Sequence, residues 1–149
     1  MTHRLAMLLP LLCWMPLAHS EPVPGSIEPT GDVPEVVGWR AETVVSGLEH
    51  PWSIAWLPDG SALITERPGR LRILRDGVLD PQPVGGVPKV LARGQGGLLD
   101  VLPHPDFAAN RLIYLTYVTG TQDANRTTLA RARFDGARLE HLEVIFQNA

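Results

Sequence analysis

The chain has 149 residues, of which 44% are hydrophobic and 19% are charged, and it carries a net charge of −3. This composition excludes a disordered or fibrous protein, and the length suits about one domain. Lys89 is the only lysine and no run of basic residues is present, so nucleic acid is not an expected partner, because phosphate binding needs concentrated positive charge.

Residues 1–20 have the layout of a signal peptide. Arg4 supplies a positive first region, residues 5–17 are apolar, and Ala18-His19-Ser20 fits a small-x-small cleavage site. The apolar run is shorter than the roughly 20 residues that span a bilayer, so no membrane span is expected. The layout predicts a periplasmic or secreted protein.

Cys13 leaves a second interpretation of this leader open, namely a lipoprotein signal, although Leu12 before it is not a small residue. Cys13 is also the only cysteine in the chain. A mature chain without it can form neither a disulfide nor a thiolate metal site.

Export of the protein by a bacterial host should yield a mature chain that begins at Glu21, because cleavage is expected directly after Ser20. Mass spectrometry of the soluble extracytoplasmic fraction measures this terminus. Recovery of an intact Met1 in that fraction would contradict the prediction.

Residues 21–40 hold four prolines among small and acidic residues, a composition typical of a semi-extended linker. The folded part is expected over residues 41–149. Its pattern predicts strands and no helix: β-branched or alternating apolar segments are bounded by Pro, Asp and Gly turn signals. The expected strands of its first half are residues 43–45, 52–56, 62–65 and 71–74. Pro68-Gly69 is expected to form the central pair of a type II turn.

The second half repeats this order of strands and turns, with expected strands at residues 98–102, 112–117, 128–134 and 142–146. It carries extra residues in a polar loop at 118–126. A repeat of about 40–50 residues, each a small antiparallel meander, is typical of a β-propeller blade. The chain has material for about two blades, whereas a closed ring needs about 4–8. We therefore expect an all-β fold and the N-terminal part of a longer propeller.

The strongest site candidate is Gln95, which lies between Gly94 and Gly96 in a glycine-rich loop before a predicted strand. Glycines allow a close approach of the backbone to another surface, and an amide offers uncharged donors and an acceptor. A plain turn before a buried strand is the alternative. Arg93 is the second candidate, because a guanidinium can bind a carboxylate through two hydrogen bonds.

Other polar residues are expected to be structural. His104 lies between two prolines in a turn, and no histidine has a partner at a metal-ligand spacing. Glu66 and Arg67 are expected to form an ion pair at a hairpin end.

Four motifs together resemble one family. Residues 50–55 (HPWSIA), 63–71 (LITERPGRL), 94–100 (GQGGLLD) and 104–107 (HPDF) are similar, in this order, to the soluble PQQ-dependent aldose sugar dehydrogenases of the glucose/sorbosone dehydrogenase family. The resemblance covers about residues 42–146.

The resemblance implies a six-bladed propeller with pyrroloquinoline quinone (PQQ) over the central channel. In the family the glutamine matching Gln95 lies at the quinone and the bound aldose. A calcium ion polarises the cofactor, a histidine takes the C1 hydroxyl proton as hydride passes to PQQ, and an external acceptor takes the electrons.

That histidine follows the segment resembling residues 142–146, and the calcium and carboxylate ligands come later still. The resemblance therefore assigns Gln95 to cofactor binding and no catalytic residue or metal ligand to this chain. His141 precedes the expected position of the base. A fragment of this extent is expected to be inactive alone. The alternative function is a non-catalytic propeller that binds a protein or glycan, because a fold alone does not fix function.

Overall fold

The structure is a computed structural model that describes Gly38 and Arg40–Asn148. The expected signal peptide and nearly all of the expected linker lie outside the described residues and stay predictions. Contacts group the chain from Ala41 onward into one compact unit. Within the described part of the chain, no helix is both long and apolar enough to cross a membrane.

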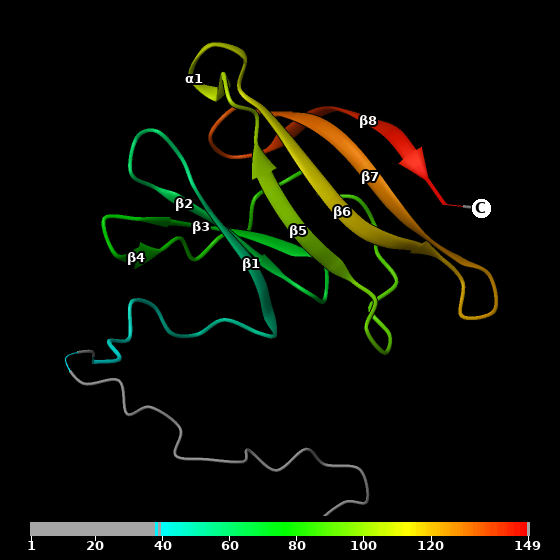
Figure 1. The fold of residues 1–149 in the computed structure, drawn as a ribbon, viewed down its shortest axis with the longest axis horizontal. Coiled ribbons are helices and arrows are strands. Elements are labelled where there is room, and N and C mark those ends of the chain that lie inside the picture. The colour runs from blue at the N-terminus through cyan, green and yellow to red at the C-terminus, as the bar shows by residue number, and fades with distance from the viewer. Residues whose placement is uncertain (1–37, 39, 149) are drawn as a thin grey trace, which may run out of the picture. The chain divides into compact units, whose positions relative to one another are not determined.

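Two four-stranded antiparallel sheets make up this unit (Figure 1). The first contains β1 (Pro51–Trp56), β2 (Ala62–Glu66), β3 (Arg70–Arg75) and β4 (Val78–Leu79). The second contains β5 (Leu98–Pro103), β6 (Leu112–Gly120), β7 (Asn125–Phe134) and β8 (Leu139–Gln147), with the single-turn helix α1 (Phe107–Asn110) between β5 and β6. In each sheet the strands pair in chain order, as in a propeller blade. The predictions of an all-β fold and of two blades are confirmed.

The turns of the first blade correct two local predictions. Glu66 pairs with Arg70, and the Gly69 N–H donates to the Glu66 carbonyl at 2.9 Å. The connection is thus a three-residue loop with Gly69 at φ 110°, and the predicted type II turn is wrong. Asp76 and Gly77, both at positive φ, form a two-residue turn that leads into β4, a strand the sequence pattern did not predict.

The predicted strand at residues 43–45 is also wrong, because this segment pairs with no strand. Its apolar residues pack instead of forming a ladder. Val45 and Leu48 cover a small cluster on β2 and β3 that contains Ala62, Ile64 and Leu74. Thr43 and Val44 stay exposed, so Val45 alone among residues 43–45 is partly buried against the sheet face.

The predicted polar loop at 118–126 is a longer hairpin in the structure. Val118 pairs with Thr127 and Gly120 pairs with Asn125, so only residues 121–124 form the tip. The extra residues of the second blade lengthen β6 and β7, because β-branched Val118 and Thr127 suit a ladder.

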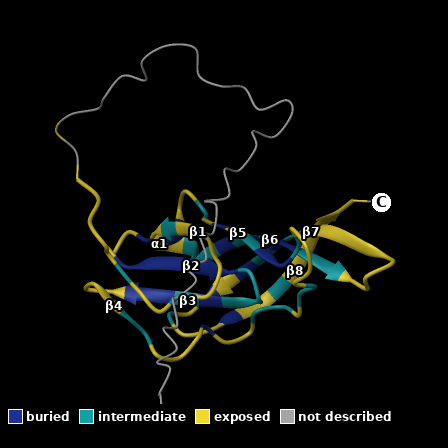
Figure 2. Cartoon of the chain, turned by 90° about the horizontal axis from the view of Figure 1, so that it is seen from below, coloured by how far each residue is buried: buried dark blue, intermediate teal, exposed yellow. Residues whose placement is uncertain are grey.

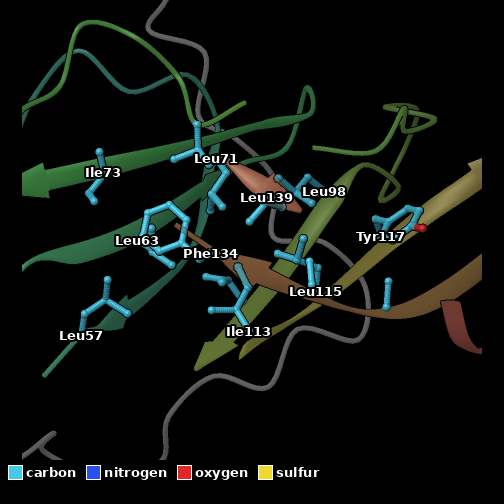
Figure 3. Packing of buried hydrophobic residues seen from close by; sticks show 14 of the residues in the cluster. Leu57, Leu63, Leu71, Ile73, Leu98, Ile113, Leu115, Tyr117, Phe134 and Leu139 are labelled. Carbon is cyan, nitrogen blue, oxygen red and sulfur yellow. The ribbon is translucent and has the colours of Figure 1, made fainter. Parts of the chain in front are cut away.

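The core lies between the two sheets, where β1 and β2 contact β5. Leu63 and Leu71 from the first blade face Ile113, Leu115 and Phe134 from the second (Figure 3). All five side chains are almost fully buried. One continuous core therefore fixes the two blades, and the loops at their ends, relative to each other.

The faces that point away from this core stay open. Trp52, Ile54 and Trp56 on β1 are 50%, 51% and 60% exposed, and Leu102 on β5 and Phe146 on β8 are 63% and 60% exposed. Figure 2 shows the contrast with β2, which is buried along its length. Apolar side chains on the outward faces of both blades are thus suited to contact further sheets.

Candidate functional site

One end of the two blades gathers the loops that carry the predicted site. The glycine-rich loop (residues 93–97) leads into β5, and the turn between β2 and β3 lies beside it. The Arg67 carbonyl at this turn accepts a hydrogen bond from the Leu98 N–H at 3.0 Å, and the Gly97 carbonyl accepts one from the Val118 N–H at 2.9 Å. The loop is therefore joined to both blades.

The glycines of this loop are required by its geometry. Gly94 has φ 55° and Gly97 has φ 143°, conformations that side chains rarely adopt. A Cβ atom on Gly97 would lie 2.2 Å from the Arg67 carbonyl oxygen, and one on Gly96 would lie 2.9 Å from that of Leu91. The backbone thus packs too closely at both positions for any larger residue.

Gln95 is exposed at the turn of this loop. Among the described residues its side-chain amide has no hydrogen-bond partner, and a Cβ built on the neighbouring Gly94 meets nothing within 4 Å. The amide of this exposed residue can therefore bind a ligand without first breaking a bond within the described chain. Its role in binding stays a prediction.

Arg93, the second candidate, is held by the neighbouring hairpin. Its Nη1 donates to the Oε1 atom of Gln122 at the tip between β6 and β7. Both residues line a shallow hollow with Gly94 and Asn125. This contact favours a role in holding the loop against the second blade.

Glu66 does not pair with Arg67, contrary to the sequence prediction. Its carboxylate is fully buried and accepts hydrogen bonds from Arg70 Nε at 2.6 Å, Arg72 Nη1 at 3.4 Å and the Glu49 backbone N–H at 2.5 Å. Burial on its own would raise the pKa of Glu66, but these donors together hold it below its ordinary value. Glu66 is thus a buried anion that joins the start of β1 to β3.

Sequence reasoning missed Arg67 as a contact of the loop. Its guanidinium donates to the Gly94 carbonyl, which is 27 residues away in the chain. No local pattern marks such a contact, since it depends on how two blades pack. The one indirect signal in the sequence was Gly97, because the Arg67 backbone leaves no room for a side chain at that position.

The contacts of the described histidines do not indicate catalysis, and those of His104 are structural. His104 Nδ1 accepts a hydrogen bond from the Asp106 N–H at 3.0 Å and lies 2.9 Å from Asn110 Nδ2, while its ring stacks on Tyr114. These bonds close the turn before α1, as expected for a structural histidine. The described residues contain no group of three or more His, Cys, Asp or Glu that could hold a metal ion.

The chain can be assigned to a known protein family from its sequence. The sequence model of the glucose/sorbosone dehydrogenase family matches residues 48–149, which include both blades and the glycine-rich loop. The chain belongs to this family.

Relatives within and near this family extend the match. An uncharacterized protein of Synechocystis, slr1608, is 54% identical over an alignment of 137 residues that covers 82% of this chain and 32% of the relative. The aldose sugar dehydrogenase YliI of Escherichia coli is 49% identical over 79 residues, 52% of this chain and 21% of the relative. The chain thus spans about a third or less of the length of these relatives.

A solved structure supports the fold as well. The PQQ-bound form of an aldose sugar dehydrogenase from Streptomyces coelicolor superposes with a TM-score of 0.62 at 28% identity, over 72% of this chain and 33% of that one. The two blades described above therefore superpose on part of that protein.

Proposed function

We propose that the protein expressed from the complete source gene, called the full-length protein below, oxidises aldose sugars at C1 with PQQ as hydride acceptor. Membership of the glucose/sorbosone dehydrogenase family and similarity to a PQQ-bound aldose sugar dehydrogenase support this function. The observation that carries it is Gln95, whose amide is exposed and unpaired among the described residues on a glycine-rich loop. The protein would act in the periplasm or outside the cell and pass electrons to an external acceptor.

The residues of the glycine-rich loop fit part of a PQQ site. A planar cofactor needs a surface free of side chains, and beside Gln95 this is Gly94, where a Cβ would meet nothing within 4 Å; the cofactor's carbonyl oxygens can accept hydrogen bonds from an amide. Gln95 would donate such a bond or bind a sugar hydroxyl, and so hold cofactor and substrate in a fixed orientation. When bound, PQQ would supply the quinone that accepts the hydride, which carries both electrons, from the sugar.

Calcium fits this chain less well. The described residues bring together no cluster of carboxylates or histidines that could hold the ion. A calcium site would therefore need ligands from outside the described part of the chain, and no step is assigned to it here. We likewise assign no described residue as the base that removes the C1 hydroxyl proton.

Replacing Gln95 by alanine in the full-length protein should weaken binding of PQQ or of the sugar by about 1–3 kcal/mol, because a ligand atom buried against the loop loses its partner. Titration of the apoprotein with PQQ, and of the loaded protein with glucose, measures both affinities. Gln82→Ala is a matched control, since Gln82 is an exposed glutamine in the loop after β4 and should leave both affinities unchanged.

Unchanged affinity for both ligands in Gln95→Ala would contradict the assignment of Gln95. Sugar binding without sugar-dependent reduction of a dye acceptor in the wild-type, PQQ-loaded protein would contradict the enzymatic function. That second outcome would favour the non-catalytic binding module.

A further inference from the structure

Arg67 contacts the glycine-rich loop on both sides of Gln95. On the N-terminal side, its guanidinium donates to the Gly94 carbonyl. On the C-terminal side, its backbone carbonyl accepts the Leu98 N–H at 3.0 Å, and a Cβ on Gly97 would lie 2.5 Å from the Arg67 Cγ. Gln95 and Gly96 therefore lie between two glycines that a single arginine of the first blade contacts.

The backbone of Arg67 is itself held firmly. Its N–H donates to the His50 carbonyl at 3.0 Å, which ties it to the start of β1. The hairpin continues at Gly69, where a Cβ would lie 2.9 Å from Val90 Cγ2 just before the glycine-rich loop. On the other side, the fully buried Glu66 carboxylate fixes the end of β2. Arg67 therefore transmits the position of the first blade to the loop.

We propose that Arg67 is a positioning residue that sets the orientation of Gln95 toward the quinone and sugar. This inference rests on the proposed function. Arg67 acts through the backbone of the loop, since its guanidinium is bonded to the Gly94 carbonyl and its stem packs on Gly97. Without that bond, the turn at Gly94 and Gln95 keeps only the local Gly96 N–H bond to the Arg93 carbonyl, at 2.8 Å. The amide of Gln95 then samples several orientations, and fewer of them are productive.

The test replaces Arg67 by methionine, which keeps an unbranched stem over Gly97 and removes the donor. In the full-length protein, Arg67→Met should lower kcat/KM for glucose by about 10- to 100-fold, the range expected when a binding group is misplaced by about 1 Å. Arg67→Lys should recover most of this loss, because an ammonium can still donate to the Gly94 carbonyl. In the apoprotein, amide hydrogen exchange over residues 93–98 should be faster in Arg67→Met.

Arg75 provides a matched control at the opposite end of the blades. Its Nη2 donates to the Gly136 carbonyl at 2.5 Å, so it also joins the first blade to a glycine carbonyl of the second. Arg75→Met removes the same kind of bond far from Gln95. It should leave kcat/KM and hydrogen exchange over residues 93–98 unchanged.

A double variant separates positioning from general damage. If Arg67 acts through Gln95, Arg67→Met should change kcat/KM by less than about threefold in a Gln95→Ala background, because effects through one shared group are not additive. Equal losses in both backgrounds, or unchanged hydrogen exchange over residues 93–98, would overturn the proposal. If Arg67→Met does not fold, the effects of Arg67→Gln and Arg67→Lys on kcat/KM are compared in the wild-type and Gln95→Ala backgrounds instead.

One result would count against the proposed role of Gln95 itself, and not only against the role of Arg67. If Gln95→Ala leaves ligand affinity and kcat/KM unchanged, the role of Gln95 is wrong, and with it the role of Arg67 in the reaction. Faster hydrogen exchange in the apoprotein of Arg67→Met would then show an arginine that orders the loop without serving a ligand there.

Discussion

Replacing Glu66 by glutamine in the full-length protein is expected to lower the free energy of unfolding by about 3–5 kcal/mol, the usual cost of removing one partner from a buried ion pair. The Glu66 side chain is 0% exposed and that of Arg72 is 11% exposed, so Arg72 would keep a charge with little access to water. Arg72 Nε already has no hydrogen-bond partner among the described residues. A neutral amide cannot offset this charge.

The same carboxylate predicts a dependence of stability on pH. The hydrogen bonds from Arg70, the Glu49 backbone and Arg72 outweigh the effect of burial and hold the pKa of Glu66 below its ordinary value of 4.5. The unfolded chain therefore binds this proton at a higher pH than the folded chain does. The stability that Glu66 contributes is present above pH 4.5 and is lost as the pH falls through the lower, folded pKa. Glu66→Gln should remove this part of the acid sensitivity.

Glu143→Gln is the matched control, because Glu143 pairs with Arg131 at 2.7 Å but is 59% exposed. An exposed pair of this kind contributes little to stability, because water screens both charges. Urea denaturation of the wild type and both variants, at pH 7 and at several values below pH 4.5, measures the two effects. Equal losses in Glu66→Gln and Glu143→Gln would show that burial of Glu66 does not matter to stability.

Much of the fold could be predicted from the sequence because propeller blades are built from local pairings. Alternation in β1 and the turn pairs Asp76-Gly77 and Asp135-Gly136 depend only on neighbouring residues, and they placed most of the strands. The errors arose where tertiary packing decided the outcome. Residues 43–45 have strand composition but pair with no strand, and only Val45 of them packs on a sheet face; β4 has too few residues to show a period.

At the candidate site, too, local sequence signals could be predicted and contacts between distant residues could not. Gln95 was marked by the glycines around it, which are a local signal. From the sequence alone, the adjacent opposite charges of Glu66 and Arg67 predict an ion pair at the end of a hairpin. In the structure they point to separate partners, Glu66 to Arg70 and Arg67 to Gly94, which belong to different blades. The Arg67 contact requires the packing of β1 and β2 against β5, which no spacing in the sequence encodes.

Expressed alone, residues 21–149 are expected neither to fold stably nor to oxidise sugars. Trp52, Ile54 and Trp56 form an open apolar row on β1, at 50%, 51% and 60% exposed, and Phe146 on β8 is 60% exposed. Burying one large apolar side chain is worth about 1.5–3 kcal/mol, and a whole domain is stable by only about 5–15 kcal/mol. These four side chains are already about half buried, so burying the rest of each would add roughly half of that value, about 3–6 kcal/mol in all, which is a large part of a domain's stability. Exposed apolar faces also favour aggregation.

Catalysis is expected to fail for a separate reason: we assign no described residue as the base, and the described residues contain no group of three or more His, Cys, Asp or Glu that could hold a metal ion. The experiment expresses residues 21–149, adds PQQ and calcium, and follows thermal unfolding by circular dichroism together with glucose-dependent reduction of a dye acceptor. The expected result is a broad or absent melting transition, aggregation and no dye reduction, with the full-length protein as the positive control. A cooperative transition would show that one core between two blades suffices for folding. Glucose-dependent dye reduction would show that residues 21–149 hold a complete active site, and the base would then have to be sought among them.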